Sequence, residues 1–449
     1  MKLTKLSLIA AMLIGSSAFA IENTKVSGNA KAYYGTQDSD KANAIASNGL
    51  VNPSSAEKSS MFSKDSSYTN FAARLDLTTD LTKGVSAGIG YQVVTTLGVE
   101  HNLVDAVWSG AHTAGGSAGS TFIKAAGGLQ VDTESWIDEA WLAGTAFDTT
   151  LKMGRMPLDT PLAFSETWGV DKNTFEAAVL INQSLPDTTI IATYIGKSNG
   201  SADDRTSLTE GGAGNLLDLG LAAAGYVGTS GEFNTFGAQG TYCFGVVNNS
   251  IKPLTVQAWY YDMVDLAEAY WLQADLNMDG IIAGVQFANT ELQDNNHLGL
   301  STEDNSAWAG VLGYEMKDTA TFKIAYSDVD EDGPLGVANT ATGSVATLGG
   351  QSKLYTEMWW NYGNVSAPGA ETVMLTAETS AVGVDFYLGF WDCEIENAAG
   401  AKTKEMNEIT FTASKSFGPL DTSLALIYAD EDVADVQTTD LQIYLTYNF

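Results

Sequence analysis

The C-terminal nine residues of the chain alternate apolar and polar side chains with a period of two. An extended strand sends successive side chains to opposite faces, so such a segment has one apolar and one polar face. The same alternation recurs near residues 70–78, 254–261 and 408–414. No long stretch shows a 3.6-residue apolar period, so the pattern predicts an all-β fold and no helical domain. The apolar positions of the last segment are Leu441, Ile443, Leu445, Tyr447 and Phe449.

The composition excludes several classes of protein. Hydrophobic residues make up 45% of the 449 residues, which is too many for a disordered chain. Two cysteines, Cys243 and Cys393, cannot supply a disulfide scaffold. The chain has 54 acidic and 22 basic residues, a net charge of −32, and would repel phosphate. Nucleic acid is therefore not an expected partner.

The first twenty residues are typical of a secretory signal peptide. Lys2 and Lys5 precede an apolar run, and Ala18-Phe19-Ala20 has the small-x-small pattern of a cleavage site. This run is too short to span a bilayer, and no later run of about eighteen apolar residues predicts a transmembrane helix. We therefore expect an exported mature chain, residues 21–449, that folds as one domain.

Alternation alone does not separate a soluble antiparallel sheet from a membrane barrel. In the best segments, however, the apolar face is free of charge over about nine residues, the length that a tilted transmembrane strand needs. The polar face mixes charges with Gly, Thr, Gln and Tyr, as a water-filled lumen would. The terminal Phe449 and the alternation before it also resemble the recognition signal of outer-membrane barrel assembly. These features favour a transmembrane antiparallel β-barrel over a periplasmic β-sandwich.

Nineteen segments have strand-like patterns, and the connections between them tend to alternate between long and short. Asp279-Gly280 is a good two-residue hairpin signal. Short turns on one side and long extracellular loops on the other are typical of outer-membrane barrels, which in bacteria have an even number of strands. The alternation fails only at residues 352–362, which we assign to the preceding loop as an aromatic lid in the mouth. This leaves eighteen strands, with sixteen as the alternative, and a barrel of that size encloses an aqueous channel.

Residues 134–177 point to a narrower family. A strand ending in Gly154-Arg155, a loop containing Pro161 and a strand opening with Phe175-Glu176 resemble the OprD-type porins and the major outer-membrane porins of campylobacter-type bacteria. The resemblance implies an 18-stranded barrel, usually trimeric, that passes small solutes. It also implies that the third long loop, here residues 157–172, folds inward and forms the constriction.

The resemblance implies a charged constriction, although one family feature is weak here. OprD-type members carry an arginine ladder, whereas this chain has only Arg74, Arg155 and Arg205, and Met156 stands where the family often has Gln. Specificity for basic amino acids is therefore not carried over. The candidate constriction residues are Arg74, Lys152, Arg155, Asp159, Glu166 and Asp171.

Enzymatic catalysis is not expected. A nucleophile with a histidine base would need His101, His112 or His297 beside it, and these lie in two separate long loops. No HExxH motif occurs. We expect no required cofactor.

One acidic segment imitates the beginning of a calcium-binding loop. Asp328, Asp330 and Asp332 stand at alternate positions and Gly333 follows, but Asn339 occupies the position of the bidentate Glu. A solvated acidic loop is the alternative interpretation. The resemblance to campylobacter-type porins implies possible calcium use, so calcium is kept as an optional ligand.

These observations predict a porin in the outer membrane of a Gram-negative bacterium, allowing passive diffusion of small hydrophilic solutes and ions. Fixed carboxylates concentrate cations, so a preference for cations is expected. The expected partners are membrane lipids and lipopolysaccharide, two further copies in a homotrimer, and the barrel assembly machinery. The alternative is a surface structural protein or adhesin on a barrel scaffold, which would show no ohmic conductance.

Overall fold

The computed structural model describes most of the predicted mature chain. The predicted signal peptide and the three histidines lie outside the described residues. The described residues are 22–40, 60–99, 102–104, 106–108, 122–124, 133–200, 233–237, 239–294, 301–342 and 350–449.

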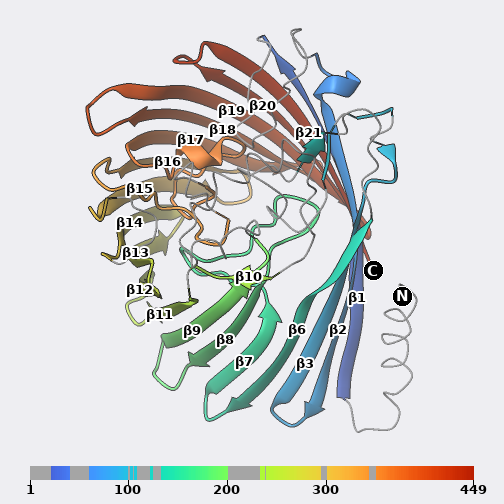
Figure 1. Ribbon diagram of the computed structural model, residues 1–449, viewed down its shortest axis with the longest axis vertical. Helices are drawn as coiled ribbons and strands as arrows, with labels where there is room; N and C mark the ends of the chain where they lie inside the picture. The colour runs from blue at the N-terminus through green and yellow to red at the C-terminus, as the bar shows by residue number, and fades with distance from the viewer. Residues whose placement is uncertain are drawn as a thin grey trace.

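Within these residues, eighteen antiparallel strands form a closed barrel (Figure 1). Each strand pairs with its neighbours in chain order, and β1 pairs with β21 to close the ring. Three short strands, β4, β5 and β10, stand outside this series. The bounds are β1 (Glu22–Ser39), β2 (Ser67–Thr82), β3 (Val85–Thr95), β4 (Ala106–Trp108), β5 (Phe122–Lys124), β6 (Glu134–Ala146), β7 (Thr149–Met156), β8 (Phe175–Asn182), β9 (Thr188–Ser198), β10 (Asn234–Thr235), β11 (Thr241–Asn248), β12 (Leu254–Met263), β13 (Ala267–Met278), β14 (Ile281–Leu292), β15 (Asn305–Met316), β16 (Ala320–Val329), β17 (Ala370–Ala381), β18 (Val384–Glu396), β19 (Lys402–Phe417), β20 (Leu420–Glu431) and β21 (Val436–Asn448).

The barrel closes on the C-terminal residue. The Phe449 N–H donates to the Gly28 carbonyl at 3.0 Å, and the Gly28 N–H donates to the Phe449 carbonyl at 2.9 Å. Leu445, Tyr447 and Phe449 are exposed on the outside, whereas Gln442 is buried. The alternation read from the sequence is therefore confirmed.

The two ends of the barrel differ in their connections. One end has tight turns such as Asp279-Gly280, where both residues have positive φ angles of 53° and 86°, as a two-residue hairpin requires. The other end carries the long loops. Residues 352–362 lie in the loop between β16 and β17, so their exclusion from the strand count is confirmed. After β9, the next strand of the barrel wall begins at Thr241, and only the short β10 precedes it.

Large apolar side chains cover the outside of the barrel. Val285, Trp308 and Leu312, on neighbouring strands β14 and β15, are each more than 60% exposed. A continuous apolar surface of this size is unfavourable in water and is typical of a barrel that contacts the hydrocarbon of a membrane.

No helix in the described part of the chain combines the length and the hydropathy needed to cross a bilayer.

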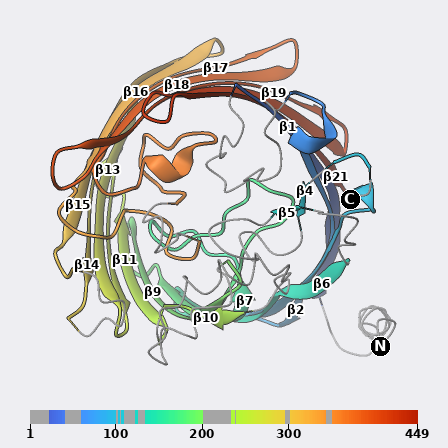
Figure 2. The same ribbon diagram turned by 45° about the horizontal axis from the view of Figure 1, so that its top comes forward.

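Much of the apolar core lies inside the barrel, where long loops fold into the lumen (Figure 2). Leu162 and Met358 come from two different loops and are buried with Trp271 and Trp391 of the barrel wall. Packed loops therefore fill one side of the interior, and any passage must run beside them.

Candidate pore constriction

The loop between β7 and β8, residues 157–174, runs into the lumen. The Leu162 N–H at its tip donates to the hydroxyl of Tyr261 on β12, at 3.2 Å. The tip is held in a compact turn because Thr160 donates to the Ala163 carbonyl at 2.7 Å. This loop, which contains the region expected at the constriction, therefore reaches from β7 and β8 to the wall formed by β12.

The loop between β16 and β17, residues 330–369, packs against the first loop inside the barrel. Asn339 is fully buried and donates to the Phe164 carbonyl at 2.9 Å and to Glu166 Oε1 at 3.1 Å. The hydroxyl of Thr342 donates to the same Glu166 oxygen. Glu166 is therefore buried between the two loops, which its hydrogen bonds link, and its side chain does not face open water.

A second contact joins the same loops at the predicted constriction residue Asp159. Lys353 forms an ion pair with Asp159 at 2.8 Å, and its ammonium lies 4.5 Å from the centre of the Phe164 ring. The Asp159 side chain is 82% exposed, so its charge reaches water. Two loops far apart in the sequence thus form one partition across the lumen.

Replacing Asn339 by alanine is expected to loosen this partition. The substitution removes four hydrogen bonds, including one that Asn339 Oδ1 accepts from the Phe164 N–H at 3.1 Å, and leaves buried groups unpaired. The cost is about 1–3 kcal/mol. Limited proteolysis of the folded barrel should cut residues 157–174 faster in the variant, and unchanged cleavage would contradict this role.

A cavity of about 410 Å³ remains between the first loop and the wall formed by β1, β2, β3, β6 and β7. It brings together three of the predicted residues, Arg74, Lys152 and Asp171. Its other charged residues were not predicted to lie at the constriction, although Lys31 shares a strand face with Tyr33 and Asp76 follows Arg74 by two positions. The charged residues that line the cavity are Lys31, Arg74, Asp76, Glu139, Lys152, Asp171 and Lys172.

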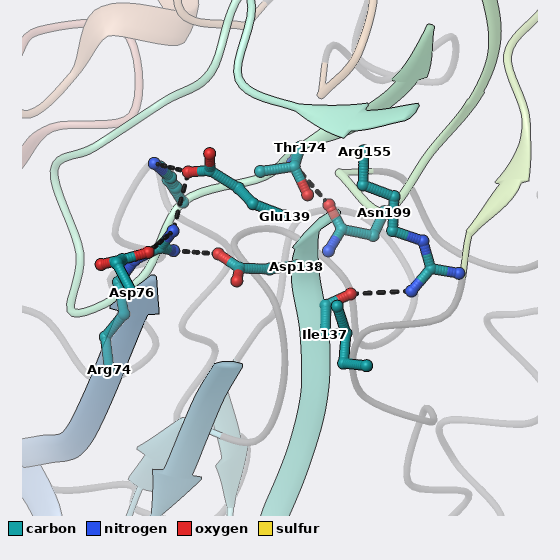
Figure 3. A network of polar contacts seen from close by, with 9 residues as sticks. Arg74, Asp76, Ile137, Asp138, Glu139, Arg155, Thr174 and Asn199 are labelled. Atoms are coloured by element: carbon teal, nitrogen blue, oxygen red, sulfur yellow. Dashed lines mark hydrogen bonds and ion pairs between the residues drawn. The ribbon is translucent and has the colours of Figure 1, made fainter. Parts of the chain in front are cut away.

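Arg74 is the centre of an ion-pair cluster beside the cavity (Figure 3). Its guanidinium contacts Asp76 at 2.7 Å, Glu139 at 2.7 Å and the nearly buried Asp138. Lys172 of the inward loop binds the same Glu139 oxygen at 2.7 Å. The Arg74 side chain is only 9% exposed, so it holds the wall and the loop together and has little surface left for a passing solute.

A β-bulge explains how two consecutive acids, Asp138 and Glu139, both face inward. Gly90 pairs with Glu139 and Tyr91 pairs with Ile137, so Asp138 is an extra residue on β6. Such a bulge turns two successive side chains to one face. A regular strand would have placed one of these carboxylates on the apolar outside.

The structure does not bring Arg155 into this cavity. Arg155 lies two residues after Met153, which is 47% exposed, and therefore shares its outward face of β7. Its guanidinium binds Glu176 at 2.9 Å and donates to the Ile137 carbonyl beside the bulge at 2.7 Å. Figure 3 shows this contact between Arg155 and Ile137.

Two cations of the cavity are less constrained than Arg74. Lys152 lies 4.2 Å from the centre of the Trp141 ring, a cation–π contact. Among the described residues, neither Lys152 nor Lys31 forms an ion pair within 4 Å. These two ammonium groups are charges that a solute in the cavity would meet, whereas the carboxylate of Asp171 is buried.

The calcium hypothesis concerns a different part of the barrel. Asp328 lies on the outer face of β16 with Tyr326, and Asp330 accepts a hydrogen bond from Ser306 at 2.6 Å. In the described residues, no three His, Cys, Asp or Glu side chains gather as metal ligands would. Calcium binding by Asp328, Asp330 and Asp332 stays a prediction.

Solved structures with the same fold come from Pseudomonas aeruginosa. OccK9 (OpdG) is 13% identical with a TM-score of 0.67, over 95% of this chain and 98% of that one. OccK8 (OprE) is 13% identical with a TM-score of 0.65, over 96% and 99%. OccK3 (OpdO) is 11% identical with a TM-score of 0.63, over 95% and 96%. The expected resemblance to OprD-type porins is thus confirmed at the level of the fold.

The sequence itself matches no protein-family model and no curated protein.

Proposed function

We propose that this protein is a porin of a Gram-negative outer membrane, through which small hydrophilic solutes and ions diffuse passively. The observation that carries the proposal is a charged cavity between an inward loop and the wall of a closed barrel with an apolar exterior. Passive transport needs a lined passage and no reacting residue. The shared fold of the OccK structures supports the same function.

We further propose that the pore prefers cations. In the cavity, four basic residues (Lys31, Arg74, Lys152 and Lys172) face acids that include Asp76, Glu139 and Asp171, so the local charges nearly cancel. The net charge of −32 for the whole chain then dominates the field along the path of the ion. A modest preference for cations follows from this balance.

Planar-bilayer recording of the detergent-purified barrel under a KCl gradient tests both statements. We expect steady ohmic channels whose reversal potential lies on the cation side. A reversal potential on the anion side would refute the cation preference and leave the porin function standing. A folded, heat-modifiable barrel that gives no conductance would refute the porin function.

Assembly and lipid contacts belong to the same proposal. We expect a homotrimer in contact with membrane lipids and lipopolysaccharide, inserted by the barrel assembly machinery through the C-terminal signal that ends at Phe449. Native electrophoresis without heating should show three copies per particle, and a monomer in mild detergent would contradict the trimer.

A further inference from the structure

A buried carboxylate on the barrel wall grips the second loop inside the lumen. Glu408 of β19 is fully buried, and its two oxygens accept hydrogen bonds from three successive backbone N–H groups. Trp359 and Trp360 each donate to Oε1 at 3.1 Å, and Asn361 donates to Oε2 at 2.8 Å. The Asn361 side chain adds a fourth loop contact at 2.7 Å. Bonds of this kind to a charged acceptor are stronger than neutral ones.

The other end of the same segment is fixed to a different part of the wall. Tyr355 donates its hydroxyl to Asp275 of β13 at 2.5 Å and its N–H to Gln286 of β14 at 3.1 Å. Gln286 in turn donates to the Lys353 carbonyl at 2.9 Å. Residues 353–361 therefore form a strap that crosses the lumen from β13 and β14 to β19.

The strap reaches the cavity through aromatic packing. Trp360 packs edge-to-face against Trp168 of the inward loop, with ring centres 6.1 Å apart. Trp360 also belongs to the buried cluster that contains Val170, and Val170 lines the cavity. A shift of residues 359–361 would therefore release the loop that forms one side of the cavity.

We propose that Glu408 is a positioning residue that sets the width of the pore by holding the strap at residues 353–361 across the lumen. It contacts no solute and acts through Trp360 on the loop that bounds the cavity. The inference rests on the proposed porin function, because it concerns the width of the same passage.

The test is the single-channel conductance of Glu408→Gln. An amide at this position keeps one acceptor oxygen and turns an NH₂ group toward backbone donors, so the grip is lost without a change in volume. We expect the conductance to rise by about twofold with frequent fluctuations, because conductance follows the open cross-section. The cut-off size in a liposome-swelling assay should rise as well.

Asp440→Asn is the matched control. Asp440 is also a buried acid of the wall, but it accepts its hydrogen bonds from Gln37 on the neighbouring strand β1, both at 3.2 Å. Both substitutions remove one carboxylate charge, and only one of them frees the strap. The control should therefore keep the wild-type conductance.

Asn361→Ala provides the same test from the loop side if Glu408→Gln fails to fold. It removes one of the four loop contacts and should raise the conductance less than Glu408→Gln does. Heat-modifiability on electrophoresis identifies the folded barrels, so a loss of stability alone does not count as an effect on pore width.

The outcomes separate this inference from the proposed function. If the wild type conducts and the folded Glu408→Gln and Asn361→Ala barrels have the same conductance as the wild type, the positioning role is refuted and the porin function stands. If the wild type is silent and Glu408→Gln conducts, the strap is a complete plug and the open-porin proposal fails. If both are silent as folded barrels, both proposals fail.

Discussion

Arg74→Gln is expected to destabilise the barrel by about 3–5 kcal/mol, the cost of leaving a buried charge without its partner. The substitution strips the guanidinium from Asp76, Glu139 and the nearly buried Asp138. Within the described residues, Lys172, which binds Glu139, is then the only cation left in an ion pair with that acidic group. In barrels that still fold, the reversal potential should move further to the cation side because the cavity loses a positive charge. Urea unfolding in vesicles and bilayer recording measure the two effects.

Arg155→Gln is the matched control for this prediction. Arg155 also binds a carboxylate, Glu176, but it lies on the outer wall and about a third of its side chain is exposed. Loss of a partly exposed pair costs about 1 kcal/mol or less. The control should leave the reversal potential unchanged. Equal shifts in both variants would show that the Arg74 cluster does not face the permeation path.

Gly154→Ala is expected to cost at least about 3 kcal/mol of stability, since strained backbone and steric overlap add together. Gly154 has a φ angle of +122°, which L side chains rarely adopt. A Cβ atom there would stand 2.1 Å from the Ala140 carbonyl oxygen and 2.9 Å from the Trp141 Cα. Both neighbours are backbone of β6 and cannot turn aside. Urea unfolding followed by tryptophan fluorescence measures the loss.

Gly144→Ala on the adjacent strand is the control. Nothing lies within 4 Å of a Cβ atom at Gly144, so the substitution should be neutral or stabilising by about 0.4–1 kcal/mol. If the two alanine variants unfolded at the same urea concentration, the special backbone at Gly154 would have no energetic weight.

The inward-facing acids show where reading one strand at a time fails. Asp138 and Glu139 are adjacent, so strict alternation places one of them on the apolar exterior. The bulge opposite Gly90 and Tyr91 removes the conflict, but it is a property of the pairing between β3 and β6. Arg155, by contrast, takes its outward position from the face that it shares with Met153 on β7, and its guanidinium donates to the Ile137 carbonyl beside the bulge.

The two loops show a similar limit. A loop sequence carries no period that indicates where it docks. Glu166 was predicted to face the pore because it is an acid in the inward loop. In the structure, however, it is buried and accepts hydrogen bonds from Asn339 and Thr342 of a distant loop. Nothing in the sequence pattern indicated that Glu408 would bind a loop, because a single acid on the polar face of an alternating strand is common in a water-filled lumen. Only the contacts with residues 359–361 distinguish it.

The sequence by itself determined the barrel. Side chains alternate locally, and a tight turn such as Asp279-Gly280 needs only its own two residues, so strand faces, hairpins and the closing segment ending at Phe449 could be predicted. The tertiary structure decided which charges meet. Asp138 and Glu139, which bind Arg74, lie on another strand, and the backbone donors to Glu408 lie in a distant loop, so long-range pairing, a bulge and loop docking bring these groups together. These contacts depend on the closed ring as a whole, which is why local pattern could not reveal them.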